Sequence, residues 1–104
     1  MSETVTFTTC RDVRQARRIA RALVGEGLAA CVNVVAGVAS IYRWKGEVEE
    51  AREALLLVKS TSARGRRLEA RIRALHSYEV PEVVTLRIAS GSAPYLRWLR
   101  ESVR

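Results

Sequence analysis

The stretch Leu28-Ala29-Ala30-Cys31-Val32-Asn33-Val34-Val35 is apolar at every position except Asn33. A second stretch, Ala54-Leu55-Leu56-Leu57-Val58, is apolar throughout and ends at Lys59. Short apolar runs rich in valine and leucine are typical of strands that are buried on both faces. The two stretches therefore predict two central strands, and both faces of these strands need cover.

The segments around these strands predict the remaining elements of a single domain over residues 1–104. Alternation of polar and apolar residues predicts strands, and apolar residues at helical spacing behind a capping residue predict helices. The acidic segment 47–53 is expected to be an exposed strand end, and Gly37 is expected to bend the chain. The predicted elements are a strand at 4–8, a helix after Asp12 that stops at Gly25-Glu26-Gly27, strands at 28–35, 41–44 and 54–58, a tight turn at Lys45-Gly46, a helix capped by Ser62, a strand at 83–88, and a helix that begins at Ser92 and Pro94.

The segments 28–35 and 41–44 count as one strand interrupted by the bend at Gly37. The order of elements is then β-α-β-β-α-β followed by an extra helix, which is that of the α+β ferredoxin-like sandwich. In that arrangement the helices cover one face of the sheet and the other face is open, so the strands ordinarily alternate polar and apolar residues. The stretches 28–35 and 54–58 do not alternate. We therefore expect identical subunits to cover the open face in a symmetric oligomer.

The composition is that of a globular protein. Apolar residues make up 48% of the 104 residues, and no apolar run approaches the roughly 20 residues that cross a bilayer. The first residues carry an acid and no basic or apolar leader, so a cytoplasmic protein without a membrane partner is expected. The formal charge of +7 comes from arginine, since Lys45 and Lys59 are the only lysines. The arginines fall mostly on the outer faces of two helices, which favours a solvated surface over a nucleic-acid partner.

Missing motifs exclude two function classes. An RNA-recognition module with the same element order carries exposed aromatic residues on its central strands, whereas residues 54–58 here read Ala-Leu-Leu-Leu-Val. A nucleophilic hydrolase would show a motif such as Gly-x-Ser-x-Gly, and neither this motif nor a phosphate-binding glycine loop occurs. No catalytic constellation is identified, so an enzyme is not expected.

Reactive side chains crowd together in one segment, the 76–82 loop, which Pro81 fixes. It contains His76, Tyr78, Glu79 and Glu82. His76, the only histidine, can act as a ligand or an acid–base group. Alternatively, its cationic form can interact favourably with the negative C-terminal end of the preceding helix dipole. One imidazole and two carboxylates make an incomplete metal site, which needs a further ligand.

Five further residues are candidates for a functional or structural role. Cys10, at a strand-to-helix turn, is expected to be reachable and can be a thiolate ligand. Cys31 is expected to be a buried structural residue in the middle of its strand. Tyr42 and Trp44 lie on one side of one strand, where they can stack bases or pack against another subunit, and packing is favoured. Lys59 can mark the edge of the core or bind an anion in a cleft.

Several segments together resemble the CutA divalent-cation tolerance family, in the same order and over essentially the whole chain. They are Gly27-Leu28-Ala29-Ala30-Cys31-Val32-Asn33-Val34-Val35, Ser40-Ile41-Tyr42-Arg43-Trp44-Lys45-Gly46-Glu47, Leu55-Leu56-Leu57-Val58-Lys59, Val80-Pro81-Glu82-Val83 and the closing Tyr95-Leu96-x-Trp98-Leu99. The resemblance implies a ferredoxin-like protomer in a homotrimer similar in plan to the PII signalling proteins. It also implies a cytoplasmic protein for tolerance of divalent metals, Cu²⁺ above all.

Taken with the residues, the resemblance leads to two hypotheses. The first is a trimeric metal-binding protein whose cleft lies between subunits. Its metal ligands would be His76, Glu79, Glu82 and Cys10, and its cleft residues Tyr42, Trp44, Lys59 and Tyr78. The alternative is a PII-like sensor in which Lys59 and nearby arginines bind a small anionic ligand.

Overall fold

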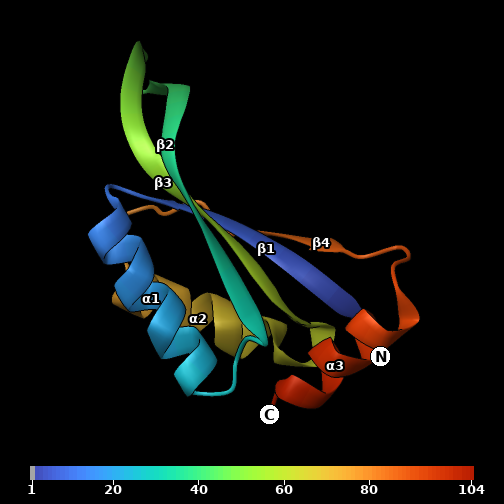
Figure 1. Ribbon diagram of the computed structural model, residues 1–104. Coiled ribbons are helices and arrows are strands. Elements are labelled where there is room, and N and C mark those ends of the chain that lie inside the picture. Colours follow the sequence, from blue (N-terminus) through green and yellow to red (C-terminus); the bar gives the residue numbers. More distant parts are fainter. Residues whose placement is uncertain (1) are drawn as a thin grey trace.

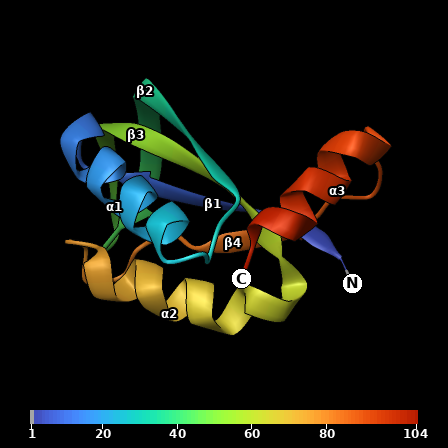
Figure 2. The ribbon, with the colours of Figure 1, turned by 60° about the horizontal axis from the view of Figure 1, so that its bottom comes forward.

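The computed structural model describes residues 2–104 and has the predicted order of elements (Figure 1). One antiparallel sheet of four strands carries two helices, α1 and α2, side by side on one face (Figure 2). The ferredoxin-like α+β sandwich with an additional C-terminal helix is therefore confirmed. The elements are β1 (Glu3–Cys10), α1 (Val13–Gly25), β2 (Cys31–Trp44), β3 (Glu47–Thr61), a 3-10 turn (Ser62–Arg64), α2 (Gly65–Leu75), β4 (Val84–Arg87) and α3 (Ala93–Ser102).

The strands lie in the order β2-β3-β1-β4. β3 joins the sheet together, because its second half pairs with β1 while most of its length pairs with β2. Beyond the end of β1, β2 and β3 continue as a two-stranded hairpin that extends away from the helices (Figure 1). The molecule is elongated as a result, with principal extents of 44 × 25 × 23 Å.

The hairpin turn predicted at Lys45-Gly46 is confirmed. The backbone angle φ is 51° at Lys45 and 82° at Gly46, and two positive values are what a type I′ turn requires. The bend expected at Gly37 is a β-bulge, because the register shifts between Val35 and Val38 and the strand then continues. β2 is therefore one strand of 14 residues, where the sequence predicted two shorter segments.

The two sides of β1 are occupied in an unusual way. Thr4, Thr6 and Thr8 point toward the helices and are buried, and the hydroxyl of Thr6 lies 2.7 Å from that of Thr85 on β4. Its apolar residues Val5 and Phe7 lie on the opposite face, where they are only partly buried. β1 thus adds apolar surface to the open face of the sheet instead of to the helix-covered face.

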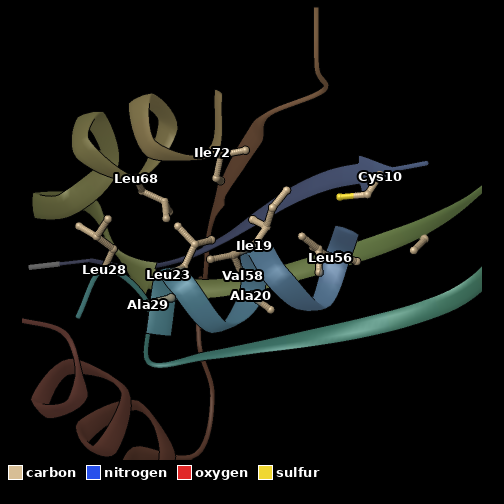
Figure 3. Close-up of a cluster of buried hydrophobic side chains, with 12 residues drawn as sticks. Cys10, Ile19, Ala20, Leu23, Leu28, Ala29, Leu56, Val58, Leu68 and Ile72 are labelled. Carbon is tan, nitrogen blue, oxygen red and sulfur yellow. The ribbon is translucent and has the colours of Figure 1, made fainter. Parts of the chain in front are cut away.

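The core lies between the sheet and the two helices (Figure 3). α1 buries Ile19 and Leu23, and α2 buries Leu68 and Ile72 in the same core cluster. All of these side chains lie on one stripe of their helix, as the apolar spacing predicted. The complete cluster is Cys10, Ala16, Ile19, Ala20, Leu23, Leu28, Ala29, Ala54, Leu56, Val58, Leu68 and Ile72.

The open face of the sheet, opposite α1 and α2, keeps apolar side chains accessible. Val84 and Leu86 of β4 are 48% and 50% exposed, and Val35 of β2 is 41% exposed. Leu55 and Leu57 of β3, between these edges, are only partly buried. Apolar surface gathered in this way is typical of a face that another protein covers.

The structure corrects both cysteine predictions. Cys10 is completely buried and was wrongly expected to be reachable, because its side chain lies on the helix-covered face of β1. Burial, together with the nearby negative charges of Glu53 and Asp12, raises the pKa of its thiol to about 11. Cys31 is the first residue of β2 and is partly exposed on the open face, so its assignment as a buried structural residue is wrong.

The helix termini match the sequence only in part. Asp12 caps α1 as predicted, since its Oδ1 accepts the backbone N–H of Gln15 at 2.8 Å. The second helix does not start on a Ser62 cap, because residues 62–64 form a 3-10 turn first. Ser92 is the N-cap residue of α3, but within residues 2–104 its side chain makes no capping hydrogen bond.

We expect this difference between the caps to be measurable. Asp12→Ala should lower the free energy of unfolding by about 1 kcal/mol, because it leaves a helical N–H without its acceptor. Ser92→Ala, the matched control, should change it by less than about 0.5 kcal/mol. Urea denaturation measures both values, and an equal loss in the two variants would contradict the assigned cap.

The buried thiol predicts a loss of stability at alkaline pH. The pKa of an exposed cysteine is about 8.5, whereas the pKa of Cys10 in the folded protein is raised to about 11. Between these values the unfolded chain binds fewer protons than the folded one, so the free energy of unfolding falls as the pH rises. The loss from Cys10 between about pH 8 and about pH 9.5 should be about 1 kcal/mol.

Urea denaturation across this pH range checks the expected loss. Cys10→Ala should remove most of the pH dependence, whatever its effect on stability at neutral pH. Cys31→Ala controls for the general effect of removing a thiol. If the wild type and Cys10→Ala show the same slope with pH, the thiol of Cys10 does not titrate as its burial requires.

Candidate functional site

An open cleft of about 740 Å³ lies between the hairpin and the 76–82 loop. The hairpin contributes one side, the loop the other, and the end of β1 reaches the cleft through Thr9. Its lining consists of Thr9, Ser40, Ile41, Tyr42, Trp44, Glu53, Ser77, Tyr78, Glu79, Val80 and Glu82. Segments far apart in the sequence thus meet at one hollow of a single protomer.

The cleft brings together five of the side chains that the sequence singled out. Tyr42 and Trp44 are two residues apart on β2, opposite Glu49 and Glu47 of β3, so strand geometry places them on one side. Each is a little over 40% exposed. The other three residues, Tyr78, Glu79 and Glu82, come from the 76–82 loop.

His76 lies behind the cleft and holds the loop in place. It is the C-cap residue of α2 and only 9% exposed. Its Nδ1 accepts the backbone N–H of Tyr78 at 3.1 Å, so the ring proton is on Nε2, which donates to the carbonyl of Thr9 at 2.7 Å. Both ring nitrogens are therefore occupied, and a metal ion could reach either one only by breaking a hydrogen bond.

Tyr78 connects the loop to the hairpin. Its hydroxyl donates to Oε2 of Glu53 at 2.6 Å, and its ring lies 4.7 Å from that of His76. Burial, with this hydrogen bond and the charge of Glu53, raises the pKa of Tyr78 above its usual range. The phenol therefore stays protonated at neutral pH and remains a donor to Glu53.

Glu53 is the cleft residue that the sequence prediction missed. Segment 47–53 was expected to be an exposed strand end, but Glu53 is only 8% exposed. It directly precedes the apolar stretch 54–58, where β3 enters the paired part of the sheet. That position was the available clue, since the strand residue beside a buried run shares its burial.

Besides His76, two predicted site residues do not line the cleft. Cys10 is in the core, and Lys59 is six residues beyond Glu53 on β3, a separation of roughly 20 Å at strand spacing. The Lys59 Nζ donates to Oδ1 of Asn33 and lies 3.8 Å from Sγ of Cys31. In one protomer, Lys59 is thus engaged on the open face and not in the cleft.

The charge of the molecule is unevenly distributed. α1 contains four arginines and no acidic residue, and all four are exposed. The cleft lining is the reverse: it has three carboxylates, Glu53, Glu79 and Glu82, and no lysine, arginine or histidine among the residues that the structure describes. The cleft therefore favours cations in a protein whose formal net charge is +7.

A preformed metal centre is not found in the described part of the chain. Within residues 2–104 no three histidine, cysteine, aspartate or glutamate side chains are grouped so that they could hold a metal ion. The proposed set of His76, Glu79, Glu82 and Cys10 is divided between the cleft, the layer behind it and the core. None of the helices in this same range combines the length and apolar character that a membrane span needs.

Residues 4–102 match the family described as CutA1 divalent ion tolerance protein. Over 100 residues the chain is 55% identical to the Divalent-cation tolerance protein CutA of Thermus thermophilus, covering 96% of this chain and 97% of that protein. It is 43% identical over 100 residues to Protein CutA of Homo sapiens, covering 96% of this chain and 56% of the human protein.

Solved structures agree with these sequence matches. The divalent cation tolerance protein from Thermus thermophilus has a TM-score of 0.95 at 54% identity, covering 98% of this chain and 99% of that one. CutA1 from Oryza sativa has a TM-score of 0.96 at 38% identity, covering 100% of this chain and 95% of that one. The chain belongs to the family of CutA1 divalent ion tolerance proteins.

Proposed function

We propose that the protein is a homotrimer that binds divalent cations in the cleft between the 76–82 loop and the hairpin. One observation above all supports this: the cleft presents three carboxylates and, among the described residues, no basic side chain. The family is named for tolerance of divalent ions, and that name describes no enzymatic reaction. A cation-binding role is consistent with both.

The ligands that remain available favour hard cations. Copper is best served by imidazole and thiolate ligands, whereas carboxylates and water suit Mg²⁺, Ca²⁺ and Mn²⁺. Both nitrogens of His76 are hydrogen-bonded, and the thiol of Cys10 is buried with a raised pKa. We therefore assign the ligand role to Glu79 and Glu82, and a supporting role to His76 and Cys10.

Two carboxylates from one protomer are enough for a weak site. Mg²⁺ is commonly held by one or two carboxylates and keeps several of its waters. A second subunit facing the cleft would add further oxygen ligands. The open apolar face of the sheet supports such an assembly, because it offers each subunit a surface to cover.

The PII-like alternative gains no support from the geometry. A sensor of small anions needs an available cation in its cleft, and Lys59 is engaged with Asn33 about 20 Å along β3 from Glu53. The carboxylates of the cleft would repel an anion. Divalent-cation binding is the function that the site favours.

Calorimetric titration with Mn²⁺ tests the assignment of the ligands. The wild type should bind with a dissociation constant of about 10⁻⁴–10⁻³ M, as expected for an exposed carboxylate site. The double variant Glu79→Gln/Glu82→Gln should bind at least about tenfold more weakly. Glu101→Gln, on exposed α3, is the matched control and should bind like the wild type.

A parallel titration with Cu²⁺ tests the supporting role of His76. His76→Gln, whose amide can replace one of the two hydrogen bonds, should retain Cu²⁺ binding to within about tenfold, because the imidazole supports the loop and is not a ligand. Loss of Cu²⁺ binding in this variant would show that the ring leaves its hydrogen bonds to become a ligand. Absence of Mn²⁺ binding in the wild type below millimolar concentration would overturn the proposed carboxylate site.

Light scattering tests the assembly. The wild type should have about three times the 11.6 kDa mass of one chain. Leu86→Glu, on the open face, should shift the mass toward that of one chain, since a charge in a covered apolar surface is costly. Val24→Glu places the same charge at an exposed position of α1 and should leave the mass unchanged. A wild-type mass near 11.6 kDa would contradict the trimer.

A further inference from the structure

The hairpin side of the cleft carries groups that the proposed divalent site does not use. They are the rings of Tyr42 and Trp44 and the buried carboxylate of Glu53. We propose that this part of the cleft binds a primary alkylammonium cation, with its charge on Glu53 and its alkyl chain on the ring of Tyr42. This second ligand uses the same cleft as the divalent cation but none of its ligands.

The size of the cleft points to an organic molecule. Its volume of about 740 Å³ falls in the range of small-molecule sites, which is about 300–1,000 Å³. A single metal ion fills only a small part of such a space, and its hydration shell gains nothing from aromatic ring faces. The divalent cation assigned to Glu79 and Glu82 therefore leaves most of the cleft free for an organic molecule.

Glu53 supplies the buried negative charge. More than nine-tenths of this residue is buried, and a buried carboxylate is costly unless it is paired or hydrogen-bonded. Tyr78 donates to Oε2 and thereby accounts for one of its two oxygens. None of the salt bridges found within residues 2–104 includes Glu53. A ligand ammonium would therefore supply the missing opposite charge.

The ring of Tyr42 supplies the surface for the alkyl chain and reinforces the preference for a positive charge. Aromatic faces carry negative potential and attract ammonium groups within about 6 Å of the ring centre. Tyr42 remains accessible, and it lies close enough to Tyr78, the hydrogen-bond donor to Glu53, to contribute to the raised pKa of Tyr78. Trp44 lies farther along the hairpin, and Nζ of Lys45 already lies 6.0 Å from its centroid, so its ring is not assigned to this ligand.

A primary ammonium suits these groups better than a quaternary one. It can donate hydrogen bonds to Glu53 and to the hydroxyl of Ser40, both of which line the cleft. A quaternary ammonium has no N–H to donate and keeps only the attraction of the ring. The site should therefore discriminate between the two by the loss of a charge-assisted hydrogen bond.

Three probes test the proposal on the assembled wild-type protein by calorimetry or ligand-detected NMR. The first, n-butylammonium, should bind saturably in the millimolar range. The second, n-butanol, has the same chain without the charge and should show no saturable binding. The third, tetramethylammonium, should bind at least about fivefold more weakly than n-butylammonium. Equal binding of either control probe would overturn the proposal, as would no saturation by n-butylammonium up to about 100 mM.

Variants locate the ligand within the cleft. Glu53→Gln and Tyr42→Leu should each weaken n-butylammonium binding by about fivefold or more. Tyr95→Leu is the matched control, because Tyr95 on α3 is similarly exposed and lies outside the cleft. Tyr42 lies on the exposed hairpin, so Tyr42→Leu still tests the proposal if Glu53→Gln fails to fold. Equal binding by Tyr42→Leu and the wild type would overturn the proposal.

The double variant Glu79→Gln/Glu82→Gln separates this ligand from the divalent cation. It should lose Mn²⁺ binding but retain n-butylammonium binding to within about twofold. Loss of both ligands would mean that only the summed negative charge of the cleft matters, which overturns the role given to Glu53. Failure of Mn²⁺ to bind the wild type would leave the n-butylammonium result unaffected.

Discussion

The simultaneous pairing of β3 with two strands is the constraint on which the rest of the structure depends. The second half of β3 pairs with both β1 and β2. Its side chains there point alternately into the core and onto the middle of the open face. Its first half has only β2 as a partner, and this is the part that leaves the body as a hairpin. Glu53 lies at the boundary between the part of β3 that pairs with both strands and the part that pairs with β2 alone. The same strand therefore supplies a packed core and a carboxylate at the cleft.

The cleft is held by a short chain of hydrogen bonds between elements. The backbone carbonyl of Thr9 on β1 accepts a hydrogen bond from His76, the C-cap residue of α2. His76 in turn accepts the backbone N–H of Tyr78, and the Tyr78 hydroxyl donates to Glu53 on β3. Each member is oriented by its neighbour, which is how a supporting layer fixes the position of the groups that meet a ligand. The histidine that looked most reactive in the sequence is thereby part of the support, and the carboxylates beside it face the space that a cation would enter.

Patterns of local chemistry in the sequence predicted most of the fold. The order of elements, the Asp12 cap and the Lys45-Gly46 turn depend on residues close in the chain, and they are confirmed. The β-bulge at Gly37 and the burial of Glu53 depend on which residues of a distant strand lie opposite, and spacing alone does not contain that information. The same reason explains the cysteines: which face of the sheet a strand residue occupies decides whether Cys10 or Cys31 is accessible, and that face is set by pairing and helix packing.

The exposed arginines of α1 have a consequence for how ions reach the protein. A small cation approaching from a distance meets a body of formal net charge +7 and is repelled, whichever side it comes from. Only within about one screening length, about 8 Å at physiological ionic strength, does the local field of the cleft carboxylates exceed that of the net positive charge. Dissolved salt weakens the long-range repulsion more than the short-range attraction. The encounter rate for cations should thus rise with ionic strength, the opposite of the usual behaviour of an electrostatically steered ligand.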